Sequence, residues 1–190
     1  MTSDENGSPS SADSVRVRTL VNALDEYRQA RERLLAVLGH SSNRDPLAEV
    51  AEHLVAALMG GKLAVNRVQK AWDVELPDGV KAQVKYLANA PGSAVWVNEH
   101  RVRRIDDVDW YVLVLVEAFT VVGVLAFPMN LAPIAAALGK RHPDQERKIE
   151  FTRANWLTIR SDSRRFRTLG MRVWLPPFEQ ESCRTRDQDD

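Results

Sequence analysis

Three side chains on two neighbouring stretches of this sequence have the types and spacing that metal-assisted chemistry requires. In WDVELPDGVKAQVKY, which covers residues 72–86, Asp73 precedes a turn, and Gln83 and Lys85 follow it. If the two stretches are the strands of a hairpin, side-chain alternation puts Gln83 and Lys85 on one face, where Asp73 meets them across the hairpin. A carboxylate and an amide oxygen a few ångströms apart suit Mg²⁺, which prefers oxygen ligands and retains several waters.

Lys85 adds an ammonium group beside that pair. An ammonium in this position can orient an attacking water and offset the negative charge that builds on a phosphorane. Together, these three groups are of the kinds that metal-assisted hydrolysis of a phosphodiester uses. The competing interpretation is a solvated hairpin, on which short charged patterns recur by chance, and Glu75 on the Asp73 face is interpreted as an exposed hairpin acid.

Two helices are predicted before the hairpin. Residues 16–38 repeat apolar side chains at helical spacing and end at Gly39. A second helix has Asp45 as a possible cap and Pro46 at its first position, and it runs to the glycine pair at 60–61. Both helices are amphipathic, so each has one face to bury.

The remaining pattern favours strands, followed by short helices. The expected strands are 63–65, 72–76, 81–87, 94–97, 109–116 and 120–127, with Pro77-Asp78-Gly79 as the hairpin turn. The last two are almost entirely apolar, as strands covered on both faces should be, and they are expected at the centre of the sheet. Asn130 is expected to cap a short helix through residue 138, and another helix is expected over 153–160.

The order of these residues resembles the PD-(D/E)xK nuclease superfamily. Glu52 lies on a helix, Asp73 at a strand, and Gln83-x-Lys85 on the next strand after a glycine turn; the resemblance runs over residues 46–127. The context EHLVAALMGGKLA before QKAWDVELPDGVKAQVKYL resembles bacterial restriction-like proteins. In that family an acid usually stands at the place of Gln83, and proline precedes the key aspartate, where this chain has Trp72.

The resemblance implies a fold, an activity and a site. The fold is α/β, with a restriction-endonuclease-like core, a central mixed β-sheet flanked by helices, and an extra N-terminal amphipathic helix. The activity is that of a Mg²⁺-dependent DNA endonuclease, with Mn²⁺ as a substitute, acting in restriction or defence against foreign DNA. Carried over to this chain, Glu52, Asp73 and Gln83 hold the metal and Lys85 serves the water. Glu49, one turn before Glu52, is the alternative helix acid.

Three other functions stay open at this stage. One is a DNA repair or recombination nuclease of the same superfamily. Another is a catalytically silent DNA-binding or assembly subunit with the same fold. The third is a protein that binds a partner through the first helix. The sequence does not decide between DNA and RNA.

Charge is distributed unevenly although the formal net charge is zero. Residues 1–14 hold three acids and no Lys or Arg, and residues 179–190 hold five acids against two arginines, so the body between them carries +6. Residues 140–172 hold ten basic side chains against four acids, an excess that can follow a phosphate backbone. The predicted DNA contacts are Arg101, Arg103, Arg104, Arg153, Arg160, Arg164, Arg165 and Arg167. For the first three, a loop with local Arg–Asp pairing is the alternative.

The chain of 190 residues is expected to divide into a disordered leader (1–14), an N-terminal helix (15–40), a nuclease-like domain (45–178) and an acidic disordered tail (179–190). The N-terminal helix can pack on the domain or pair with a second copy, so a homodimer is a predicted partner state. A single cysteine, Cys183, and the absence of a signal-like or membrane-spanning run predict a cytoplasmic protein without disulfides.

Overall fold

The computed structural model describes residues 11–39, 46–65, 71–89 and 101–178. The chain divides into two compact units, Met1–Pro46 and Leu47–Asp190. The predicted acidic tail, the strand predicted at 94–97 and the proposed cap Asp45 lie outside the described residues.

Helix α1 (Ser11–Leu38) is the described element of the first unit. It ends as predicted before Gly39, whose φ of +74° suits a residue without a side chain. It begins at Ser11, so the helix starts inside the stretch predicted as leader, while residues 1–10 of that stretch lie outside the described ranges.

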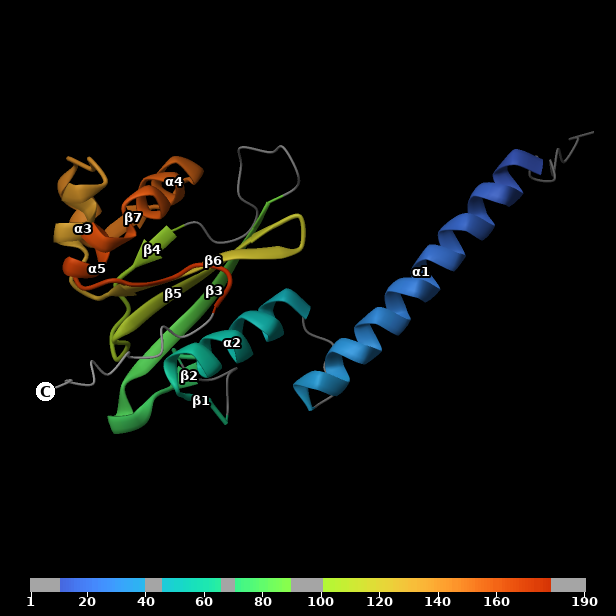
Figure 1. Ribbon diagram of the computed structural model, residues 1–190, viewed down its shortest axis with the longest axis horizontal. Helices are drawn as coiled ribbons and strands as arrows, with labels where there is room; N and C mark the ends of the chain where they lie inside the picture. The colour runs from blue at the N-terminus through green and yellow to red at the C-terminus, as the bar shows by residue number, and fades with distance from the viewer. Residues whose placement is uncertain (1–10, 40–45, 66–70, 90–100, 179–190) are drawn as a thin grey trace, which may run out of the picture. The chain divides into compact units, whose positions relative to one another are not determined.

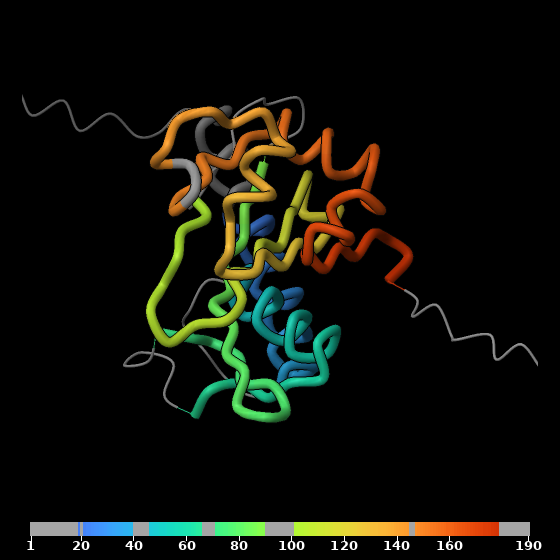
Figure 2. The backbone as a smooth tube through the Cα atoms, turned by 90° about the vertical axis from the view of Figure 1, so that its left-hand side faces the viewer, coloured from blue at the N-terminus to red at the C-terminus, as the bar shows by residue number. Residues whose placement is uncertain are grey.

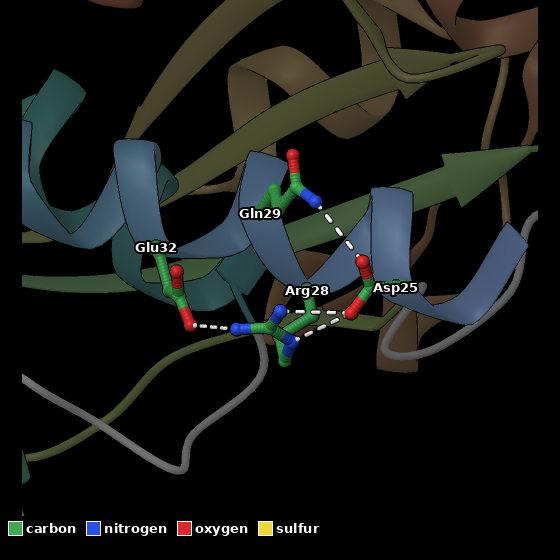
Figure 3. A network of polar contacts seen from close by, with 4 residues as sticks. All are labelled: Asp25, Arg28, Gln29 and Glu32. Carbon is green, nitrogen blue, oxygen red and sulfur yellow. Dashed lines mark hydrogen bonds and ion pairs between the residues drawn. The ribbon is translucent and has the colours of Figure 1, made fainter. Parts of the chain in front are cut away.

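The polar side of α1 carries a network of charged and amide side chains (Figure 3). The guanidinium of Arg28 contacts Asp25 Oδ1 at 2.7 Å and Glu32 Oε1 at 2.8 Å, and Gln29 Nε2 donates to Asp25 Oδ2 at 3.0 Å. These contacts hold the pKa of Asp25 below its ordinary value, chiefly through the hydrogen bonds from Arg28, and they raise the pKa of Arg28. Arg28 is therefore compensated by carboxylates of its own helix.

The second unit is a mixed α/β fold (Figure 1). Within the described residues, six strands form one sheet in the order β1-β2-β3-β5-β6-β8. Their bounds are β1 Lys62–Leu63, β2 Val74–Glu75, β3 Lys81–Asn89, β5 Trp110–Glu117, β6 Thr120–Pro128 and β8 Arg172–Trp174. Strands β3 and β5 run parallel and the other neighbouring pairs run antiparallel, so the sheet is mixed, as predicted.

Helices and a small ribbon accompany this sheet. Strands β4 (Arg101–Arg103) and β7 (Lys148–Glu150) pair antiparallel in a separate ribbon. The helical elements are α2 Pro46–Met59, η1 Pro77–Gly79, α3 Ala132–Ala137, η2 Pro143–Glu146, α4 Arg153–Ser161 and α5 Ser163–Thr168. Among the described ranges, no helix has the length and apolar character needed to cross a membrane.

The sheet separates two hydrophobic clusters. One cluster joins α2 to one face, and its members include Ala51, Val55, Met59, Val74, Ala82, Val84, Val112, Val114 and Val124. The other joins the opposite face to the C-terminal helices and the β4–β7 ribbon, and its members include Leu87, Leu113, Leu115, Phe127, Ile134, Ile149, Trp156 and Phe166. Figure 1 shows α2 on one side of the strands and α3 and α4 on the other, and in the turned view of Figure 2 the cyan α2 and the orange α3–α4 region again lie apart, with strands between them.

Most of the long helices and strands were predicted from the sequence, whereas several of the short ones were not. The second helix, the hairpin turn, the central apolar strands and α4 are confirmed. The prediction that Asn130 caps a helix is wrong, because Leu131 is the N-cap of α3 and makes no side-chain capping bond. Strands β4, β7 and β8 and helix α5 were not predicted.

Candidate active site

The hairpin that carries the predicted site is formed by β2 and β3. Val74 pairs with Ala82, and Glu75 pairs with Lys81. The turn between the strands contains Asp78 at φ +68° and Gly79 at φ +75°, which reverses the chain over three residues. Just before β2, the Asp73 N–H donates to the Ala82 carbonyl at 2.9 Å. Asp73 is thereby held beside the start of β3.

The carboxylate of Asp73 is the centre of the site. Its side chain is buried, with 7% of the residue surface exposed. One of its oxygens, Oδ2, accepts a hydrogen bond from the Val84 backbone N–H at 2.8 Å and another from the Gln83 side-chain amide. The contact across the hairpin that strand alternation predicted between Asp73 and Gln83 is therefore present.

Lys85 lies two residues beyond Gln83 on β3, so the two side chains share a face. Lys85 is exposed and Gln83 is half-buried. The neighbours Ala82 and Val84 point to the other face and belong to the cluster under α2. At the start of β3, the face toward α2 is therefore apolar and the opposite face is polar. The Lys85 ammonium on the polar face is accessible to solvent.

The helix acids predicted for the site lie on α2. Glu52 is 3% exposed and Glu49 is 1% exposed, so both acids of the helix are buried. Helix α2 packs on the face that carries Ala82 and Val84, whereas Gln83 lies on the other face. The predicted ligand set is thus divided: Asp73 and Gln83 are in direct contact, and Glu52 comes from the helix on the opposite face.

The oxygen donors at the hairpin determine which metal ion the site can bind. Among the described residues, no group of three or more His, Cys, Asp or Glu side chains is placed to hold a metal ion. The Asp73–Gln83 pair supplies one carboxylate and one amide, a donor set of the type that suits Mg²⁺ with several retained waters.

A polar cavity of about 760 Å³ lies beside the hairpin. Its lining includes Lys81 from the start of β3, and Arg104 and Asp109 from the segment before β5. Asp109 accepts a hydrogen bond from the Lys81 backbone N–H at 2.8 Å, and the Lys81 ammonium stands 4.1 Å from the centre of the Trp72 ring. The hairpin register pairs Lys81 with Glu75, so strand alternation does not predict this contact with Trp72.

The predicted DNA-contact arginines are distributed over β4, α4, α5 and the segments next to them. Some of them contact the protein itself: Arg101 pairs with Glu150 at 2.9 Å, Arg153 with Glu117 at 3.3 Å, and the Arg167 side chain donates to the Val173 carbonyl at 2.7 Å. The alternative for Arg101, Arg103 and Arg104 was a loop with local Arg–Asp pairing. Arg101 instead pairs with a glutamate on β7. The exposed members are Arg101, Arg103, Arg104, Arg160, Arg164, Arg165 and Arg167.

No protein-family model matches this chain, and a search of curated proteins finds no similar one.

Proposed function

We propose that this chain is a Mg²⁺-dependent DNA endonuclease with a restriction-endonuclease-like core, acting in restriction or defence against foreign DNA. The observation that carries the proposal is the buried Asp73 carboxylate in contact with Gln83, with the exposed Lys85 on the same face of β3 as Gln83. Support comes also from the order of the elements, in which helix α2 precedes the β2–β3 hairpin and β3 runs parallel to the central strand β5.

The donor set is compatible with a cation after one local change. The Gln83 amide turns its nitrogen toward Asp73, because a carboxylate accepts hydrogen bonds. Rotation of the amide by half a turn would exchange nitrogen for oxygen, and the Asp73 carboxylate and the Gln83 amide oxygen would then be the two side-chain donors to a divalent cation. The Val84 N–H keeps the carboxylate in place during this change.

Each side chain then has a distinct task. Asp73 and Gln83 hold the cation, and the buried carboxylate of Glu52 adds negative charge from α2. Mg²⁺ bound at this position supplies Lewis-acid polarisation of the scissile phosphate. Lys85 orients the attacking water and offsets the charge that grows on the phosphate oxygens.

The exposed arginines give this site a means of holding a phosphate backbone. Arg103 and Arg104 lie next to each other at the end of β4, and Arg104 also lines the cavity beside the hairpin. Arg160, Arg164 and Arg165 are exposed on α4 and α5. Contacts of this kind are independent of base sequence and weaken as salt rises, so they position DNA without selecting a sequence.

The test is cleavage of plasmid DNA and of unmodified and modified phage DNA with Mg²⁺ or Mn²⁺. Wild type is compared with Asp73→Asn, which keeps the shape and an acceptor for Val84, and with Lys85→Ala. Lys62→Ala is the matched control, since Lys62 is an exposed lysine on β1 of the same sheet. Metal-dependent cleavage that both site variants lose and the control keeps supports the proposal, and cleavage that survives Asp73→Asn contradicts it.

A catalytically silent DNA-binding subunit is the second candidate. Two observations favour it. Among the described residues, no three acidic, histidine or cysteine side chains lie close enough together to hold a metal ion, and Gln83 stands where the superfamily usually has an acid. This function predicts DNA binding that weakens with salt, no cleavage of any substrate in Mg²⁺ or Mn²⁺, and DNA affinity unchanged by Lys85→Ala. A repair or recombination nuclease would instead cut branched or damaged DNA in preference to phage DNA.

A further inference from the structure

The turn between β5 and β6 holds two residues in a conformation that favours glycine. Glu117 pairs with Thr120, so the turn consists of Ala118 and Phe119 alone. Their φ angles are +48° and +61°. A two-residue hairpin turn with positive φ at both positions is formed with least strain by Asn-Gly or Gly-Gly, and a bulky residue in this conformation is rare. Phe119 therefore weakens the turn to which it belongs.

Packing within the second unit does not explain why a phenylalanine stands there. Phe119 is 85% exposed and is a member of neither hydrophobic cluster. Among the aromatic side chains that the structure describes in this unit, it is the exposed one, and the others are buried or half-buried. Residues held in strained backbone conformations gather at sites that contact ligands. The turn therefore indicates a ring presented for contact.

The turn lies beside the first turn of α4. Arg153, the first residue of that helix, contacts Glu117 at 3.3 Å. The ring of Trp156 fills the space over Gly123 of β6, where a glycine Cβ would lie 2.5 Å from the ring. Helix α4 is thus fixed to the same hairpin whose end carries the exposed ring.

The outer face of α4 and α5 is basic. Arg153, Leu157 and Arg160 follow one another at steps of four and three residues, so they form one stripe that begins beside the turn. Residues 153–167 hold five arginines against one acid. A single exposed ring next to such a surface suits a nucleic acid, because arginines contact its phosphates and an apolar side chain inserts between its bases.

We propose that Phe119 is a wedge that inserts at one base step of duplex DNA, while arginines of α4 and α5 contact the neighbouring phosphates. Proteins that bind single strands stack successive bases on several aromatic side chains, whereas one apolar side chain opens a single step of a duplex. The single ring therefore favours the duplex. The inference rests on the DNA binding of the proposed function and is independent of cleavage.

The wedge lies far from the proposed cation site. Strands β3 and β5 are parallel, and Gln83 pairs with Tyr111 whereas Asn89 pairs with Glu117. At about 3.3 Å per residue, the strand between these two levels is about 20 Å long. Figure 1 shows the yellow β5–β6 turn at the opposite end of the sheet from the β2–β3 turn. Insertion therefore acts about six base pairs from the cleaved step, at 3.4 Å per pair.

Two glycine substitutions separate the wedge from the strain of the turn. Phe119→Gly and Ala118→Gly each suit a position with positive φ, so each is expected to raise the melting temperature by about 2–4 °C. The measurement is thermal unfolding of the full chain followed by circular dichroism. A melting temperature of Phe119→Gly below that of wild type would show that the ring packs against another part of the chain, and it would overturn the proposal.

DNA affinity should change in the opposite direction. It is measured in chelator at low salt by fluorescence anisotropy of a labelled duplex and of its single strand. Phe119→Gly is expected to weaken duplex binding about 5- to 150-fold, the contribution of stacking on one base, whereas Ala118→Gly and Phe119→Trp should keep the wild-type affinity. Unchanged duplex affinity of Phe119→Gly, an equal loss in Ala118→Gly, or a loss for the single strand alone overturns the proposal.

A fluorescent purine analogue in the same duplex reports insertion, because its emission rises when it is unstacked. Wild type and Ala118→Gly should raise the emission, and Phe119→Gly should not. Binding of wild type without this rise overturns the wedge, as does a Phe119→Gly variant that loses binding to anionic lipid vesicles and keeps its binding to DNA. A wild type that binds and unstacks DNA without ever cleaving it supports the wedge and refutes the nuclease function.

Discussion

Replacing Gln83 by Glu separates the amide's role as a hydrogen-bond donor from its role as an oxygen ligand. The Gln83 amide donates a hydrogen bond to Asp73, and an ionised Glu cannot donate one. A hydrogen bond to a charged group is worth about 1.5–3 kcal/mol, and two carboxylates about 4 Å apart repel by about 4 kcal/mol at an effective dielectric of 20. Because the half-buried side chain can turn toward solvent, the net loss of stability is expected to be about 2–4 kcal/mol.

On the proposed function, binding of Mg²⁺ should remove this penalty, because the second carboxylate would become a ligand. By linkage, a penalty of about 2–4 kcal/mol that disappears on binding raises the apparent metal affinity about 30- to 700-fold. The variant should therefore unfold at a melting temperature roughly 5–15 °C below wild type in chelator and recover with Mg²⁺.

The assay is thermal unfolding followed by circular dichroism, in chelator and across a Mg²⁺ titration. Gln83→Met, of similar length and without either charge or ligand oxygen, is the control, and its melting temperature should not respond to Mg²⁺ more than that of wild type. Equal stability of Gln83→Glu and wild type in chelator, or an equal response of the two proteins to Mg²⁺, would refute the reasoning about this pair.

Three further predictions follow from described contacts. Lys85→Ala should lower cleavage by about 100-fold or more, the usual contribution of a positioned catalytic group, yet leave the Mg²⁺-induced rise in melting temperature unchanged, because the lysine is no ligand. Gly123→Ala should cost about 1–3 kcal/mol in urea unfolding, since a Cβ there would lie 2.5 Å from the Trp156 ring, and Trp156→Phe in the same chain should recover part of the loss. The pKa of Asp25 is lowered by Arg28, so its contribution to α1 is complete above the ordinary carboxylate pKa and is lost as pH falls through the lowered value; the far-UV circular dichroism of Asp25→Asn and wild type should converge there.

The sequence was informative where a feature is local. Pro46 and the glycine pair at 60–61 delimit α2 because proline suits the first turn and glycine the residue after the last. The apolar runs of β5 and β6 indicated strands covered on both faces, which they are. Alternation along the hairpin was enough to bring Asp73 and Gln83 together.

Features that depend on distant pairing were not predictable. Strands β4 and β7 have three residues each, and they exist because Arg101 pairs with Glu150, far along the chain. A segment of three residues is too short to show the alternation of polar and apolar side chains that predicts a strand. The burial of both Glu49 and Glu52 was likewise hidden, since two acids beside an apolar stripe look solvated until the packing of α2 on the sheet is known.

The hydrogen bond from the Val84 N–H to Asp73 makes the geometry of the site depend on the register of β2 against β3. Slipping β2 against β3 by one residue would exchange the faces of the hairpin and present the carboxylate with a different amide and side chain. The contacts of Asp73 therefore depend on the pairing of β2 with β3. A chain that misfolds at this hairpin therefore loses the Asp73–Gln83 contact and the Val84 hydrogen bond together.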